Sequence, residues 1–246
     1  MVSLASIRLE VEERLKGRVP APFASRPPLQ KSTISTGISE IDSLCRGIPI
    51  GAITEIVADR WSSAGRKSLM LQLLTRMTAE QNCVLVDAND SFDPLSASGA
   101  GVNLRRLLWV RCSGKGIKAL EQAFASADLL LQGGCGFGLL ILDLSLLAPE
   151  QVRKVPTSTW FRLRSVVERL QLPLVIATTH KVVGTCSALT LSLKKAEIQW
   201  SEAAEKCLAH GRLPMAINFR LQAEERHHTK KPVSAERVFR TEQKWA

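Results

Sequence analysis

The chain has 246 residues, which is enough for one substantial α/β domain but not for two full domains of ordinary size. Hydrophobic residues make up 45% of the chain and charged residues 23%, and no apolar run approaches the roughly 18 residues of a membrane helix. Charged residues interrupt the apolar positions near the N-terminus, so a secretory signal peptide is not indicated and we expect a cytoplasmic protein without a membrane partner.

The charge balance is strongly basic, with a formal net charge of +10. Such a balance favours acidic partners, either nucleic acid or a negatively charged protein surface. The basic residues are spread along the chain rather than clustered, which weakens the case for one dedicated DNA groove. Direct DNA contact and a merely solvated basic surface therefore both stay open. The six cysteines lack the spacing of a zinc site or a disulfide framework, so we expect them to be small buried hydrophobic residues.

The first segment, residues 1–31, combines a short helix with a linker. Apolar residues at Ile7, Val11 and Leu15 alternate with charges as in an amphipathic helix, and Gly17 favours its end. Residues 19–28 are rich in proline and predict an extended linker. This arm could dock on a neighbouring subunit, on another protein or on its own domain, and self-association stays open.

From residue 32 onward, strand-like apolar runs alternate with helical segments, which predicts an α/β core of mostly parallel strands flanked by helices. We assign residues 32–200 to this core. We assign residues 201–246 to a ribbon strand followed by a polar tail that could be flexible. Strands are expected at 53–57, 83–87, 107–110, 139–143 and 174–178, helices at 69–81, 117–132 and 159–170, and an antiparallel terminal ribbon at 191–200 and 216–222.

Between the first expected strand and helix lies a loop that resembles a degenerate phosphate-binding loop. The intact pattern G-x-x-x-x-G-K-[ST] brings backbone N–H groups, a lysine and a hydroxyl to the phosphates and Mg²⁺. With Gly65 as the second glycine, Arg66 replaces the lysine and Lys67 the hydroxyl residue. With Lys67 and Ser68 as lysine and hydroxyl, both glycine positions hold side chains. An ordinary strand-to-helix turn is the alternative. The loop reads Arg60-Trp61-Ser62-Ser63-Ala64-Gly65-Arg66-Lys67-Ser68.

Beyond this loop, a series of segments resembles the core of RecA-type recombinases in the same order. They include the entry segment, the turn into the first core strand, the block that carries the catalytic glutamate, the Walker B strand and the strand that leads to the sensor residue. The resemblance spans about residues 32–200 and implies a RecA-like P-loop NTPase core. The segments are residues 35–42, 47–56, 86–94, 101–108, 139–143 and 174–180.

The departures from the family pattern concern catalysis. Asn89 stands where the resemblance places the glutamate that orients the attacking water, and an amide cannot accept the proton. His180 stands where the sensor is usually glutamine, and the loop at residues 181–192 looks shorter than the family's DNA-binding loop. No residue is therefore assigned a catalytic role. Asp143 could hold Mg²⁺ through water, or it could simply cap the turn after its strand.

Residual nucleotide binding remains an expectation of this resemblance. Cations at a helix N-terminus form a fair anion site, so ATP with Mg²⁺ could bind weakly although no cofactor is required. The residues that would contribute are Ser63, Gly65, Arg66, Lys67, Ser68 and Asp143.

Among RecA relatives, residues 64–69 resemble the altered phosphate loop of the ImuA group. That resemblance implies a bacterial accessory protein of SOS-inducible translesion synthesis, which tolerates DNA damage through contacts with translesion polymerase proteins and with RecA. One alternative is a divergent DNA-dependent ATPase or recombinase that uses Lys67 and Ser68 and recruits Asp90 or Asp93. A second alternative is a cell-division inhibitor similar to SulA, although this chain is longer and retains more of the nucleotide-site skeleton.

The polar tail contains three apolar residues that we take as candidates for partner binding, and packing back on the domain is the alternative. These residues are Val238, Phe239 and Trp245.

Overall fold

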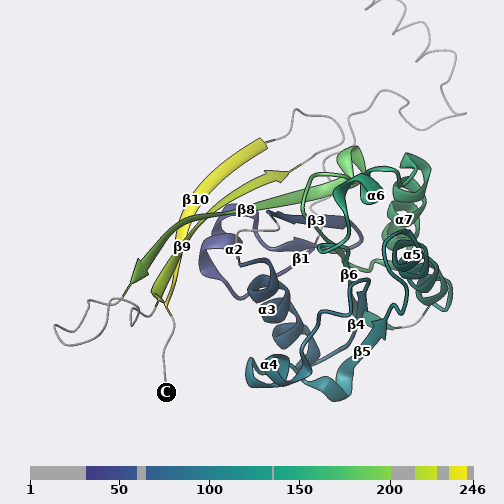
Figure 1. Ribbon diagram of the computed structural model, residues 1–246, viewed down its shortest axis with the longest axis horizontal. Coiled ribbons are helices and arrows are strands. Elements are labelled where there is room, and N and C mark those ends of the chain that lie inside the picture. Colours follow the sequence, from purple (N-terminus) through teal and green to yellow (C-terminus); the bar gives the residue numbers. More distant parts are fainter. Residues whose placement is uncertain (1–31, 60–64, 135, 201–213, 226–232, 243–246) are drawn as a thin grey trace, which may run out of the picture. The chain divides into compact units, whose positions relative to one another are not determined.

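A computed structural model describes residues 32–59, 65–134, 136–200, 214–225 and 233–242, all within the unit Lys31–Ala246. The expected N-terminal arm at residues 1–31 lies outside these residues, as do Ser63 and Trp245. The described chain forms an eight-stranded, mostly parallel sheet and a separate two-stranded antiparallel sheet, β1 (Thr33–Ile34) with β2 (Ile48–Pro49). Helices flank the large sheet (Figure 1). The expected α/β class is therefore confirmed.

The large sheet has the strand order β10-β9-β8-β3-β7-β6-β4-β5, and all neighbours from β8 to β5 are parallel (Figure 1). The five expected core strands are confirmed with shifts of at most two residues at their ends. Four of them, β3, β4, β6 and β7, are almost entirely buried, as the nearly continuous apolar runs predict for parallel strands with helices on both faces. The five strands are β3 (Ile53–Ala58), β4 (Asn82–Asp87), β5 (Leu107–Arg111), β6 (Phe137–Asp143) and β7 (Leu174–Thr178).

The helices divide between the two faces of the sheet because alternate strand residues point to opposite sides. Ile56 and Ile141 pack in one core with α2 (Ser39–Cys45), α3 (Arg66–Thr78) and α4 (Pro94–Gly99). The opposite core joins strand residues such as Val84 and Ile176 to three other helices. These are α5 (Ile117–Gln132), α6 (Pro149–Arg153) and α7 (Thr157–Leu170).

The helix expected at residues 69–81 begins and ends three residues earlier, at Arg66 and Thr78. Gly65 precedes it with a φ of 74°, a left-handed conformation that glycine adopts at little cost. The turn can therefore pass directly into the helix, which places Arg66 and Lys67 in its first turn.

The terminal ribbon has three strands rather than two: β8 (Ser187–Trp200), β9 (Pro214–Glu225) and β10 (Val233–Glu242). β8 pairs with β3 in parallel and with β9 in antiparallel fashion, and β10 pairs with β9. The third strand lies in the segment that we expected to be a polar tail. Its charged residues conceal the strand in the sequence, but an outermost strand tolerates them. Val238 and Phe239 lie in β10, opposite Arg220 and Phe219.

The described residues also bear on the expected burial of the cysteines and on membrane-spanning helices. Four cysteines are free and buried, as expected, and burial raises the pKa of the Cys45 thiol to about 11 and that of Cys83 to about 12. The other two of this group are Cys112 and Cys186. In the described part of the chain, no helix combines the length and the apolarity that crossing a bilayer requires.

Candidate functional site

The carboxyl ends of the parallel strands meet at one edge of the sheet, where ligands bind in open α/β folds. The preferred place lies between adjacent strands whose onward connections run over opposite faces. β4 and β6 are such a pair, because β4 leads to α4 on one face and β6 leads to α6 on the other. Each strand ends in a buried aspartate, Asp87 and Asp143, and the two are aligned in register.

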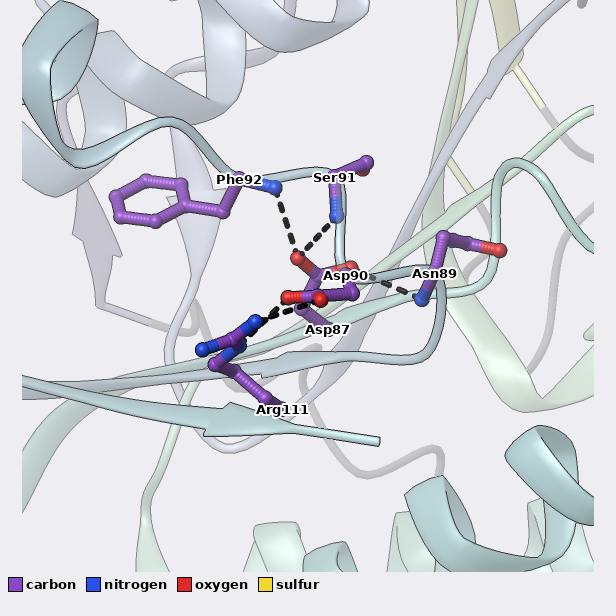
Figure 2. Close-up of polar contacts among 6 residues, drawn as sticks. All are labelled: Asp87, Asn89, Asp90, Ser91, Phe92 and Arg111. Carbon is purple, nitrogen blue, oxygen red and sulfur yellow. Dashed lines mark hydrogen bonds and ion pairs between the residues drawn. The ribbon is translucent and has the colours of Figure 1, made fainter. Parts of the chain in front are cut away.

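Asp87 is used entirely as an anchor for the turn that follows β4. Its Oδ1 accepts a hydrogen bond from the N–H of Asn89 at 3.0 Å, and its Oδ2 accepts from Ser91 and Phe92 at 2.7 and 2.8 Å. Figure 2 shows these backbone N–H groups converging on the carboxylate. Three donors satisfy most of its acceptor capacity, so Asp87 fixes the position of Asn89 rather than serving as a base.

Asn89 lies in the turn after β4 and ties it to the neighbouring strand. Its side-chain amide donates a hydrogen bond to the carbonyl oxygen of Asp143 at 3.3 Å. The amide that the resemblance to recombinases would place at the general base therefore acts as a donor to the protein itself. A carboxylate there would instead face the Asp143 carbonyl oxygen with a negative charge.

The two carboxylates considered as substitutes for a general base are both engaged elsewhere. Asp90 forms a two-pronged ion pair with Arg111, at 2.6 and 2.7 Å, and this hydrogen bonding lowers the pKa of Asp90 (Figure 2). Asp93 accepts from Leu95 and Ser96 at the N-terminus of α4, and hydrogen bonding by Ser96 lowers its pKa. A lowered pKa makes each carboxylate a weaker base, which disfavours the ATPase alternative.

Arg66 is folded into the protein at the start of α3. Its side chain is only 8% exposed, and its Nη1 donates a hydrogen bond to the carbonyl oxygen of Ala58 at 2.6 Å. Burial lowers the pKa of Arg66, while the charge of Asp143 acts in the opposite direction. This cation therefore connects the N-terminus of α3 to the end of β3 and compensates a buried carboxylate.

Asp143 is 4% exposed, and its Oδ1 accepts the N–H of Ser145 at 2.9 Å. Burial raises its pKa, although hydrogen bonding by Ser145 and the charge of Arg66 oppose the shift. The hydrogen bond to Ser145 is the capping contact of a strand-terminal aspartate, which was the alternative to a magnesium role.

The remaining loop residues differ in what they contact. Lys67 is exposed, and its Nζ donates to the carbonyl oxygen of Ser91 at 3.0 Å, which links α3 to the turn after β4. Ser68 is exposed in the first turn of α3, after Gly65. Gly65, Arg66 and Lys67 thus lie at the start of α3, and the charge of Asp143 acts on Arg66.

The two cations at the start of α3 are engaged with the protein itself. A phosphate at a helix N-terminus is bound best by cations directed toward it, but Arg66 and Lys67 both donate to protein carbonyl groups. In the described part of the chain, no three His, Cys, Asp or Glu side chains gather as metal ligands.

Sequence reasoning missed a buried carboxylate beneath the loop after β7. Glu55, in β3, is 1% exposed, and its Oε1 accepts the N–H groups of Val182 and Val183 at 2.6 and 3.1 Å. Burial raises the pKa of Glu55, against the effect of these two amides. We expected a loop at residues 181–192, but strand β8 begins at Ser187, so the loop ends before that residue. A charged residue within an apolar strand was the signal that could have revealed this anchor.

A cleft of about 420 Å³ lies beside this loop, lined by the end of β3, the middle of β8, Gln222 of β9 and the end of α6. His180 is exposed at the cleft, and its Nδ1 lies 2.9 Å from the hydroxyl of Thr179. The sequence did not reveal the cleft because its walls come from segments far apart in the chain. A search against protein-family models finds none that matches this chain.

Proposed function

We propose that this protein is a non-hydrolysing, RecA-like accessory protein of bacterial DNA-damage tolerance, related to the ImuA group. In this role it acts in the cytoplasm within an SOS-inducible translesion synthesis assembly. Its partners are translesion polymerase proteins and RecA, and DNA is a further candidate. Support comes from the collinear family-like segments and from a mostly parallel sheet in which β3 is followed directly by the degenerate loop and α3.

The observation that carries the proposal is the inward hydrogen bond of Arg66 to Ala58. A hydrolysing site needs a cation that stabilises phosphate charge in the transition state and a base that positions water. At these positions the chain has a cation committed to its own backbone and an amide, Asn89, that donates to Asp143. Recognition of other macromolecules requires neither group, so a protein-binding role is compatible with both.

The first test is phosphate release from ATP with Mg²⁺ and single-stranded DNA. We expect a rate at background for the full chain, unchanged in Lys67→Ala and Asp143→Asn. Turnover comparable to that of a recombinase, abolished by either substitution, would refute the proposal in favour of the ATPase alternative.

The second test is co-purification of the tagged full chain from bacteria with damaged DNA. We expect translesion polymerase proteins or RecA to be enriched over an untagged control. Enrichment of the division tubulin, together with filamentous growth on overexpression, would instead support the cell-division alternative.

A further inference from the structure

The cleft beside the loop after β7 is the feature that the site described above leaves without a role. Its volume of about 420 Å³ lies in the range of small-ligand and peptide side-chain sites. The loop itself is held from below by Glu55 through the amides of Val182 and Val183. One wall of the cleft is therefore fixed before any ligand arrives, which lowers the entropic cost of binding.

The entrance of the cleft is positively charged. Arg153, at the end of α6, and Lys194, on β8, are exposed lining residues, and neither has an ion-pair partner among the described residues. A third lining cation, Lys181, forms an ion pair with Glu224. Two cations without partners at one opening favour a ligand that carries a negative charge.

The interior of the cleft is partly apolar. Val57 and Leu193 line it together with Ser192, which is 9% exposed. The hydroxyl oxygen of Ser192 has no hydrogen-bond partner within the part of the chain that the structure describes. An unpaired buried hydroxyl costs free energy, and an acceptor oxygen of a ligand would remove that cost.

From this combination we infer that the cleft binds an acidic peptide segment of a protein partner. A carboxylate of the peptide lies between Arg153 and Lys194, and an apolar neighbour contacts Val57. The inference rests on the proposed accessory function, for which it names the kind of partner and the place where it binds.

The chemistry of the lining favours a peptide over a nucleic acid. Single-stranded nucleic acid is held by aromatic platforms as well as by cations, whereas the lining residues include no Phe or Trp. A carboxylate beside an apolar side chain needs no aromatic surface, so an acidic peptide fits this lining better than a nucleic acid does.

The test is fluorescence anisotropy of the full chain with a labelled short peptide of alternating leucine and glutamate. A peptide with glutamine in place of glutamate, and single-stranded oligothymidylate, serve as comparison probes. We expect the acidic peptide to bind, and Arg153→Glu with Lys194→Glu to weaken binding by about tenfold or more. The control pair, Lys154→Glu with Lys115→Glu, makes the same change in net charge outside the cleft and should leave binding within about twofold.

Several results would overturn the inference. Equal weakening by both pairs of substitutions would show that only net charge matters. Tighter binding of oligothymidylate that is lost in the cleft pair would identify a nucleic-acid groove instead. Failure of the acidic peptide to bind better than its glutamine counterpart would also reject the acidic-peptide site.

Ser192→Ala adds a readout that separates binding from folding. Since its buried hydroxyl has no partner in the described residues, its removal should raise the melting temperature while weakening the peptide by about two- to tenfold. Lower stability with unchanged affinity would contradict the assignment. ATP turnover measured on the same samples distinguishes failure of the two proposals. Peptide binding together with ATP turnover would refute only the non-hydrolysing role. Absence of both peptide binding and turnover would refute only the binding site in the cleft.

Discussion

Arg66 and Ala58 are joined by a buried hydrogen bond of 2.6 Å that runs from a guanidinium group to a backbone carbonyl oxygen. The bond ties the first residue of α3 to the last residue of β3. The Arg66 cation is thereby made part of the fold. Its removal should therefore affect stability more than any binding activity.

For Arg66→Ala we expect a loss of about 2–3 kcal/mol in the free energy of unfolding, because the substitution removes a charged donor from the Ala58 carbonyl oxygen and a compensating charge from Asp143. Urea denaturation followed by circular dichroism measures this change. Lys67→Ala is the matched control, since that side chain is exposed and should contribute no more than about 0.5 kcal/mol. Equal stability of the two variants would contradict the structural role of Arg66.

Asp87 and Asp90 offer a second matched pair, since both carry hydrogen bonds at the same turn. Asp87→Ala leaves three N–H groups without their buried acceptor and should cost on the order of 3 kcal/mol. Asp90→Ala breaks an exposed, solvent-screened ion pair with Arg111 and should lower stability much less than Asp87→Ala. Thermal unfolding of both variants measures the difference, and a larger effect at Asp90 would show that this account of the turn is wrong.

Much of the fold followed from local pattern. Continuous apolar runs gave the buried strands, and the helix at residues 117–132 has the expected bounds. The strand Val233–Glu242 did not follow, because its charged residues also suit a solvated tail and only pairing with β9 makes it a strand. Tertiary pairing overrode local composition there.

The site was only partly accessible from the sequence. The apolar run before Asp143 predicted a strand that ends at this aspartate, but the inward direction of Arg66 depends on a backbone carbonyl that no sequence pattern marks. The cleft forms where α6, β3, β8 and β9 come together in the fold. These elements are far apart in the sequence, so no local sequence pattern predicts the cleft.

Glu55 should make stability depend on pH. Since burial raises its pKa in the folded protein, the folded state holds the proton more tightly than the unfolded chain, and this contribution to stability is lost as pH rises from about 4.5 through the raised pKa. Glu55→Gln removes the titration yet retains an oxygen to accept from Val182 and Val183. We therefore expect the melting temperature of Glu55→Gln to rise relative to that of the natural chain as the pH increases from about 4 to about 7.

Glu80→Gln is the control for this pH series, because it makes the same substitution at an exposed glutamate. Glu55→Leu adds a second comparison, since it removes the acceptor for two amides and should destabilise the protein at every pH by about 2 kcal/mol. A difference between Glu55→Gln and the natural chain that stays constant across the series would contradict a raised pKa.

Removal of residues 233–246 deletes β10 and leaves the twelve-residue strand β9 as an unpaired edge. Because long open edges associate with other strands, we expect a lower melting temperature and aggregation that increases with concentration. A chain that lacks only residues 243–246 retains β10 and should behave like the full chain, which light scattering and thermal unfolding can check. Identical behaviour of the two truncations would mean that β10 contributes nothing to the sheet.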